Sequence, residues 1–158
     1  MTIITVNAPK GRLSLDQRRE LAETLTDAVL VPEVGQFAPA ARVGFQVYFA
    51  ERERDMMAVG GRLLVDAGSE LDVMVIDLAV MDAAWQPDVR AEVIERVLAA
   101  LAAACGMEEP SPAWWVNFRV IDEGSWGSSG GVLSVLPLLE SGVFTEERVK
   151  AVRAALGV

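Results

Sequence analysis

A repeat with a period of 70 residues constrains the fold of this chain more than any other feature of its sequence. The glycine pair Gly60-Gly61 recurs as Gly130-Gly131, and Leu63 recurs as Leu133 at the same spacing. A fixed internal period indicates that one supersecondary unit occurs twice. The chain of 158 residues therefore holds two such units and is long enough to bury a core between them.

The first copy has the pattern of a strand, a helix and a second strand. Ile3–Val6 is a short apolar run, and Ser14–Gln17 has the residues of a capping box, which marks the start of a helix. Apolar residues follow at helical spacing, and we expect Pro32 and Gly35 to end the helix. Val43–Ala50 places alternate apolar side chains, beginning with Val43, on one side, which predicts a strand. A glycine turn and a return strand follow it.

The second copy repeats this order of elements. Val73–Leu78 reads as a strand, and Pro87 occupies the first turn of a helix, where a missing N–H costs nothing. We expect this helix to end at Gly106 and a strand to span Trp114–Ile121. After a second glycine turn, Thr145–Leu156 reads as a C-terminal helix.

These elements predict an α/β fold made of tandem β-α-β-β units. Each helix is long enough for a right-handed crossover that joins two parallel strands. We expect units at residues 1–70 and 71–158 to pack as a single domain, with one four-stranded core sheet and two helices on one face. The opposite face carries Tyr48 and Trp115, which makes it too apolar for water. We therefore infer that other subunits cover it.

Composition excludes several classes of function. The net charge is −9 and no lysine or arginine cluster occurs, so we expect no nucleic-acid and no membrane partner. Histidine is absent, which excludes Ser-His-Asp and Cys-His catalysis and histidine-ligated metal. We expect no metal and no cofactor, because cysteine clusters and nucleotide-binding motifs are missing too. The single Cys105 and the absence of a signal peptide predict a cytoplasmic protein, with Cys105 as a buried structural thiol rather than a nucleophile.

One glycine- and serine-rich segment, Ile121–Ser134, carries a tryptophan at its centre, Trp126. Glycine permits a backbone with positive φ and a close approach of a ligand or a neighbouring chain. Two interpretations stay open for Trp126. It forms the wall of a pocket, or it plugs a subunit interface at the tip of a hairpin.

The chain resembles a fused member of the tautomerase superfamily, of the 4-oxalocrotonate tautomerase-like kind, over roughly residues 2–135. The residues that carry the resemblance are Gly11-Arg12-Leu13-Ser14 with Asp16-Gln17, Ala58-Val59-Gly60-Gly61, and Gly124-Ser125-Trp126-Gly127 followed by Gly130-Gly131. The resemblance implies a homotrimer of fused chains that acts on small 2-oxo acids, their enols or unsaturated acids. It also implies an amino-terminal proline as general base, arginines that hold the substrate carboxylate and an aromatic pocket wall.

The resemblance assigns three site residues, and the alternating pattern of the strand Trp114–Ile121 adds Arg119 as a fourth. Thr2 stands where the family has its proline, so removal of Met1 would expose a primary α-amine in place of a secondary one. Arg12 matches the carboxylate-binding arginine, and Trp126 the aromatic wall. Two interpretations stay open for each arginine. Arg119 either binds the carboxylate or pairs with an acidic side chain across a subunit boundary. Arg12 either binds the carboxylate or is only a surface residue of the helix.

Three interpretations of function follow. In the first, the protein is a keto–enol isomerase whose N-terminal amine moves a proton beside the carbonyl of a small carboxylic acid. In the second, it is an inactive trimer that keeps the fold and a small-anion pocket. In the third, the repeated units form a dimeric ferredoxin-like barrel. The oligomeric state separates the first two interpretations, which require a trimer, from the third.

Overall fold

A four-stranded sheet forms the centre of the protein, which we describe from a computed structural model over residues 1–68 and 71–158. Its strands, in chain order, are β1 (Thr2–Pro9), β2 (Phe45–Arg52), β5 (Met74–Met81) and β6 (Trp114–Ile121). The spatial order is β2-β1-β5-β6, with β1 parallel to β2 and β5 parallel to β6. The two repeats meet where β1 and β5 pair antiparallel. The predicted α/β fold with one shared sheet is therefore confirmed.

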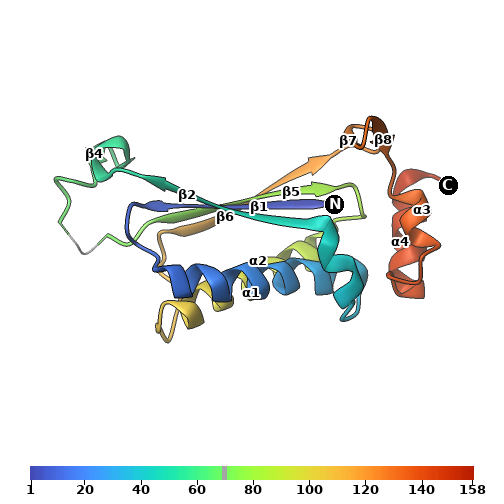
Figure 1. Cartoon of the computed structure of the whole chain (residues 1–158), viewed down its shortest axis with the longest axis horizontal. Helices are drawn as coiled ribbons and strands as arrows, with labels where there is room; N and C mark the ends of the chain where they lie inside the picture. Colours follow the sequence, from blue (N-terminus) through green and yellow to red (C-terminus); the bar gives the residue numbers. More distant parts are fainter. Residues whose placement is uncertain (69–70) are drawn as a thin grey trace.

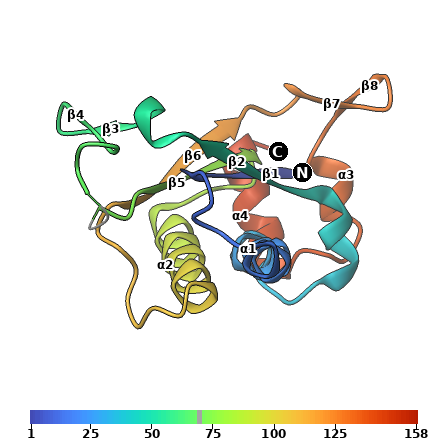
Figure 2. The ribbon, with the colours of Figure 1, turned by 60° about the vertical axis from the view of Figure 1, so that its left-hand side comes forward.

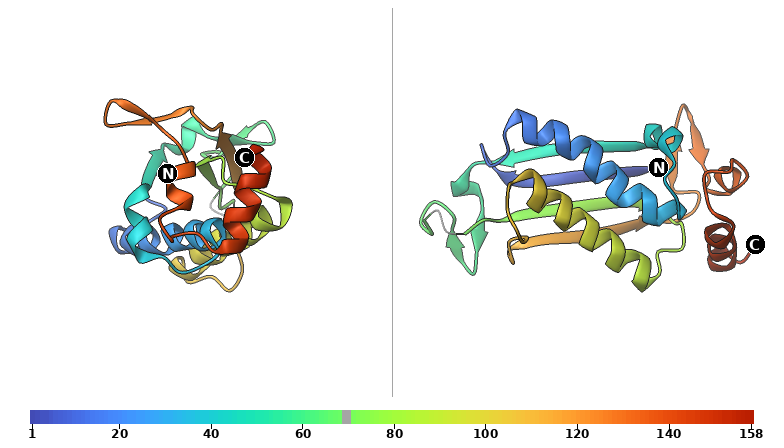
Figure 3. Two further views of the ribbon diagram at one scale, coloured as in Figure 1. Left: turned by 90° about the vertical axis from the view of Figure 1, so that its right-hand side faces the viewer. Right: turned by 90° about the horizontal axis from the view of Figure 1, so that it is seen from below.

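Two long helices, α1 (Leu15–Val34) and α2 (Pro87–Ala104), cover one face of this sheet (Figure 3). The capping box predicted at Ser14 and Gln17 is present at the start of α1, and Pro87 is the first residue of α2. On the central strands β1 and β5, the residues facing the helices are buried, and those that are 0% exposed include Ile4, Val6, Ile76, Leu78 and Val80. The core therefore lies between the sheet and the helices, and the other sheet face stays open (Figure 2).

Several predicted boundaries are wrong. The strands expected at Ile3–Val6 and Val73–Leu78 span Thr2–Pro9 and Met74–Met81. α1 continues through Pro32 to Val34, so the missing N–H of the proline does not end the helix. Gly35 then ends the helix with φ of +81°, and its N–H donates to Val31 O at 2.8 Å. Val43 lies outside β2, in the 3-10 helix η1 (Pro39–Gly44), and is 91% exposed. Since β1 begins at residue 2, which pairs with residue 45, no neighbouring strand is available to Val43.

Each repeat ends in a small hairpin. β3 (Ala58–Val59) pairs with β4 (Arg62–Leu63), and β7 (Trp126–Ser128) pairs with β8 (Gly131–Leu133). The two central turn residues have positive φ in both hairpins, as a tight two-residue turn requires. These residues are Gly60 and Gly61 in the first turn but Ser129 and Gly130 in the second, so the turns lie 69 residues apart. Met57, in the first repeat, is thus the structural counterpart of Trp126.

The C-terminal segment closes one end of the sheet. It consists of α3 (Leu136–Leu139), which the sequence did not predict, and α4 (Glu146–Leu156), which it did. Thr145 caps α4 and donates its N–H to Val34 O at 2.8 Å, so the segment is fixed to the end of α1. The β7–β8 hairpin, α3, α4 and the amino terminus all lie at this end, and the β3–β4 hairpin lies at the other (Figure 1). Among the residues that the structure describes, no helix has the length and apolar character that a membrane span requires.

Candidate active site

A cavity of about 440 Å³ lies beside the amino terminus, where β1 begins and β6 ends. Its lining includes Met1, Thr2, Arg119 and Trp126, so three of the four predicted site residues come together. The strand order explains this meeting, because the start of β1 lies level with the ends of β5 and β6. The fourth predicted residue, Arg12, lies elsewhere.

Arg119 points away from the core. Along β6, Trp115, Asn117 and Arg119 are exposed on the open face, while the alternate residues Val116, Phe118 and Val120 pack against the core. Within residues 1–68 and 71–158, Arg119 makes no ion pair and no hydrogen bond. Its guanidinium is therefore free in this chain to receive an anion or an acidic side chain of another subunit.

Trp126 lies where the predicted aromatic wall of a pocket would stand. It is half-buried, packs against the hydrophobic core and pairs with Leu133 across the hairpin. The tight turn at Ser129 and Gly130 folds this hairpin so that Trp126 lines the cavity. This position fits an aromatic wall, while a role at a subunit interface stays open.

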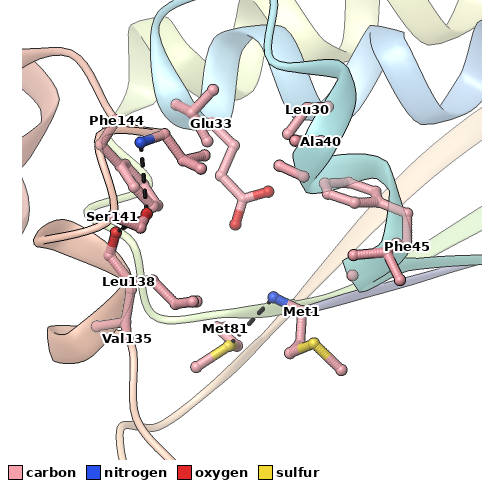
Figure 4. A pocket seen from close by; sticks show the side chains of 15 residues that line it. Met1, Leu30, Glu33, Ala40, Phe45, Met81, Val135, Leu138, Ser141 and Phe144 are labelled. Carbon is pink, nitrogen blue, oxygen red and sulfur yellow. Dashed lines mark hydrogen bonds between the residues drawn. The ribbon is translucent and has the colours of Figure 1, made fainter.

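Thr2 is 1% exposed, and its side chain lies on the helix side of the sheet with Ile4 and Val6. Its hydroxyl is buried and finds no hydrogen-bond partner among the described residues. The α-amino group of Met1 lies 3.2 Å from Met81 Sδ (Figure 4). A thioether is a weak acceptor, so this contact leaves the amine largely unpaired.

Arg12 lies at the opposite end of β1, and an eight-residue strand separates it from Thr2 by roughly 25 Å. Its Nε and NH2 groups donate to the two carboxylate oxygens of Asp72 at 2.7 and 2.8 Å. The guanidinium also lies over the Trp114 ring, 5.8 Å from its centroid. Within one chain, Arg12 is thus held in an ion pair and does not reach the cavity that Arg119 lines.

Glu33 is the polar residue at this end that sequence reasoning missed. It lies in the last turn of α1, is 4% exposed and points into a second, apolar cavity next to Met1 (Figure 4). Burial raises the pKa of Glu33 to about 7, against the opposing effects of the α-amino group, Arg148 and Thr2. A sequence signal existed, because Glu33 follows Leu21, Leu25 and Val29 at four-residue spacing on the buried stripe.

Cys105 is half-buried at the C-terminal end of α2, and burial raises the pKa of its thiol. A protonated thiol is a poor nucleophile, which favours the structural role expected for it. Within the described ranges, no three cysteine, aspartate or glutamate side chains are grouped so that they would hold a metal ion.

Comparison with solved structures places this architecture among known folds. The chain is similar to native fused 4-OT, with a TM-score of 0.67 and 24% identity over 86% of this chain and 98% of that one. It is similar to N1, a member of the cis-3-chloroacrylic acid dehalogenase family, with a TM-score of 0.69 and 16% identity over 96% and 99%. It is also similar to Pt0534 inactivated by 2-oxo-3-pentynoate, with a TM-score of 0.66 and 19% identity over 86% and 98%.

Three other fused 4-OT structures among the matches are trimers, two asymmetric and one symmetric. No protein-family model matches the sequence, and no curated protein matches it. The structural matches nevertheless cover nearly the whole of the known chains. The protein therefore has the fold of the tautomerase superfamily, as the sequence predicts.

Proposed function

We propose that this chain, which has the tautomerase fold, binds small 2-oxo acids or their enols and interconverts the two forms. The observation that carries the proposal is the cavity in which the amino terminus and Thr2 lie with Arg119 and Trp126. The likeness to fused 4-OT supports the reaction class. The likeness to Pt0534, which 2-oxo-3-pentynoate inactivates, supports a small 2-oxo acid as substrate.

The residues divide the chemistry between them. The N-terminal amine removes a proton from the carbon beside the carbonyl and returns one in the reverse direction. Arg119 holds the carboxylate and stabilises the developing enolate with its positive charge. Trp126 excludes water from one side of the reacting centre, which strengthens both interactions.

The test is the ketonisation rate of an aryl- or alkyl-substituted enolpyruvate, followed by absorbance. Arg119→Ala should lower kcat/KM at least about tenfold, which corresponds to the lower end of the free energy of a hydrogen bond to a charged group. Arg52→Ala is the matched control, since Arg52 is an exposed arginine at the far end of the same sheet. Equal rates for the wild type and Arg119→Ala would refute the role of Arg119, and an uncatalysed rate in all proteins would refute the activity.

A second function, an inactive trimer with a small-anion pocket, rests on a different observation. The α-amine of Met1 contacts Met81 Sδ. The backbone nitrogen of Thr2 lacks the fixed orientation that a proline ring would give it. Calorimetry with a panel of 2-oxo acids separates the two functions. Binding that depends on Arg119 without any ketonisation would identify a binding protein.

Assembly as a homotrimer belongs to both functions. Tyr48 and Trp115 are 53% and 64% exposed on the open sheet face, an apolar surface that a partner subunit would cover. The fused 4-OT trimers support this assembly. A cytoplasmic location stays part of the proposal and follows from the single cysteine.

A further inference from the structure

The apolar cavity at the end of α1 holds one ionisable side chain. Its volume is about 250 Å³, and side chains such as Leu30, Phe45, Leu138 and Phe144 form its wall. Among the residues that line it, Glu33 is the only one with an ionisable side chain (Figure 4). Burying a carboxylate among hydrocarbon is costly unless it gains a partner.

No partner in the described part of the chain satisfies the Glu33 carboxylate. Oε2 is buried and accepts no hydrogen bond. The Thr2 hydroxyl lies near enough to lower the pKa of Glu33, but the two groups form no hydrogen bond of standard geometry. Two charged groups face it, the α-amino group at the start of β1 and Arg148 on α4.

Arg148 is occupied elsewhere. Its Nε donates to the main-chain oxygen of Glu33 at 2.9 Å, and its NH2 group donates to the carbonyl oxygens of Ala83 and Ala84. The guanidinium therefore fixes the backbone around Glu33 and leaves the carboxylate acceptor vacant. A vacant acceptor at the wall of an apolar cavity is the arrangement that recognises a ligand with one donor.

The size of the cavity limits the ligand. A dry cavity of about 150 Å³ is enough to bind benzene. The cavity beside Glu33 therefore has room for one aromatic ring or a short branched alkyl group with a polar substituent. A second carboxylate at this place would be repelled by Glu33, whereas a neutral hydroxyl would be attracted.

We propose that this cavity binds the aromatic or alkyl part of a ligand and that the Glu33 carboxylate accepts a hydrogen bond from a neutral hydroxyl on that ligand. The identity of the natural ligand rests on the proposed function, because the enol of an aryl- or alkyl-substituted 2-oxo acid has both groups. Met1, Val43 and Gly44 line this cavity as well as the one that Arg119 lines. One substrate would thus place its carboxylate at Arg119 and its apolar substituent beside Glu33.

In this arrangement Glu33 takes part in proton transfer. During ketonisation the carboxylate takes the enol O–H proton, the C–O bond becomes a carbonyl, and the protonated amine delivers a proton to the neighbouring carbon. The proton held by Glu33 then passes to the amine, so that both groups return to their starting states. The reverse order of steps gives enolisation.

The first experiment needs no turnover and uses 4-methylphenol as the probe. Carbon-13 NMR of the labelled glutamate side chains follows the titration of Glu33, assigned by its loss in Glu33→Gln. A bound hydroxyl stabilises the carboxylate, so saturating probe should lower the Glu33 pKa measurably and Glu33→Gln should weaken probe binding at least about fivefold. Glu23→Gln, on the exposed face of the same helix, is the matched control and should bind like the wild type.

Toluene, which has the ring without the hydroxyl, completes this experiment. Equal binding of toluene and 4-methylphenol, or an unchanged Glu33 titration at saturation, would overturn the proposal. The Glu33→Gln and Glu23→Gln variants should keep the circular dichroism spectrum of the wild type, because glutamine matches glutamate in size.

The second experiment measures ketonisation of an aryl-substituted enolpyruvate against pH. Glu33→Gln should lower kcat about 10–100-fold and remove the limb of the pH profile near 7, whereas Arg119→Ala should raise KM as well as lower kcat and should keep that limb. An unchanged profile would overturn the proton-transfer role. If the wild type gives no ketonisation, the proposed function fails, and the probe experiment still decides whether the cavity binds a hydroxyl-bearing ring.

Discussion

Arg12 and Asp72 form a two-pronged ion pair that joins the turn after β1 to the segment before β5. Both side chains are 24% exposed, so water screens the pair only in part. The pair raises the pKa of Arg12, chiefly through its hydrogen bonds to Asp72. The two repeats are therefore linked by charge as well as by the pairing of β1 with β5.

The pair should contribute to stability. Arg12→Ala and Asp72→Ala should each lower the free energy of unfolding, and the double mutant should show a coupling energy of about 1–2 kcal/mol, above the range for exposed pairs. Urea denaturation of the four proteins measures it. A coupling energy near zero would mean that the two side chains stabilise the fold independently of one another.

The same variant tests the carboxylate-binding role that the sequence assigns to Arg12. That role requires Arg12→Ala to weaken binding of a small 2-oxo acid by roughly 1.5–3 kcal/mol. Calorimetry under conditions where the variant is fully folded gives the answer. Unchanged affinity would leave Arg12 with the structural role alone, as its distance from Arg119 within one chain suggests.

Glu33 should make stability depend on pH. Its pKa is about 7 in the folded protein, raised by burial from an ordinary value of 4.5. Between these values the folded state binds more protons than the unfolded state, so stability falls as pH rises from about 4.5 to 7. The loss is at most about 3 kcal/mol.

Glu33→Gln removes this titration. Its free energy of unfolding should exceed that of the wild type above pH 7, and the difference should shrink as pH falls toward 4.5. Chemical denaturation at a series of pH values measures the difference, and Glu23→Gln provides the control for a lost surface charge. A difference that does not change with pH would show that Glu33 does not titrate in this range.

The sequence predicts elements whose signals are local. The strand Trp114–Ile121, the capping box at Ser14 and the N-terminal proline of α2 need no information from the rest of the chain. The end of β2 nearest Val43 depends instead on where its partner strand begins. A pattern within residues 43–50 cannot contain that information.

The candidate site divides in the same way. Trp126 belongs to a glycine-rich motif and Arg119 to the polar side of a predicted strand, so local sequence signals predict both, and the strand order brings them to one cavity. Glu33 resembles a surface residue in the last turn of a helix, although it falls on the buried stripe. Its burial results from α3, α4 and the loop before α4, which pack against the end of α1 from more than 100 residues away.

The open sheet face predicts the oligomeric state. Light scattering in moderate salt should give about three times the chain mass of 17.0 kDa. Trp115→Glu, which places a charge on this face, should dissociate the assembly, because burying an unpaired charge costs several kcal/mol. A monomer at micromolar concentration would contradict the trimer, and a dimer would support the ferredoxin-like alternative.

Thr2→Pro tests whether the rest of the active site is intact. Proline fits this position, because the first residue of a strand tolerates a missing N–H, and it removes the buried hydroxyl that lacks a partner. Its ring fixes φ and so orients the terminal nitrogen once Met1 is removed, which intact mass will verify. Ketonisation should therefore rise by about tenfold or more, which is part of the ~10²–10⁴ that a general base typically contributes.

The double variant Thr2→Pro with Arg119→Ala decides what such a gain means. If the gain disappears, the new base acts on a substrate that Arg119 holds, and the cavity at the end of β6 is the site of the reaction. If the gain persists, the amine works without that anchor. No gain in a trimeric protein that has lost Met1 would show that a base alone does not restore the chemistry, and the binding function would then be the better account of the cavity.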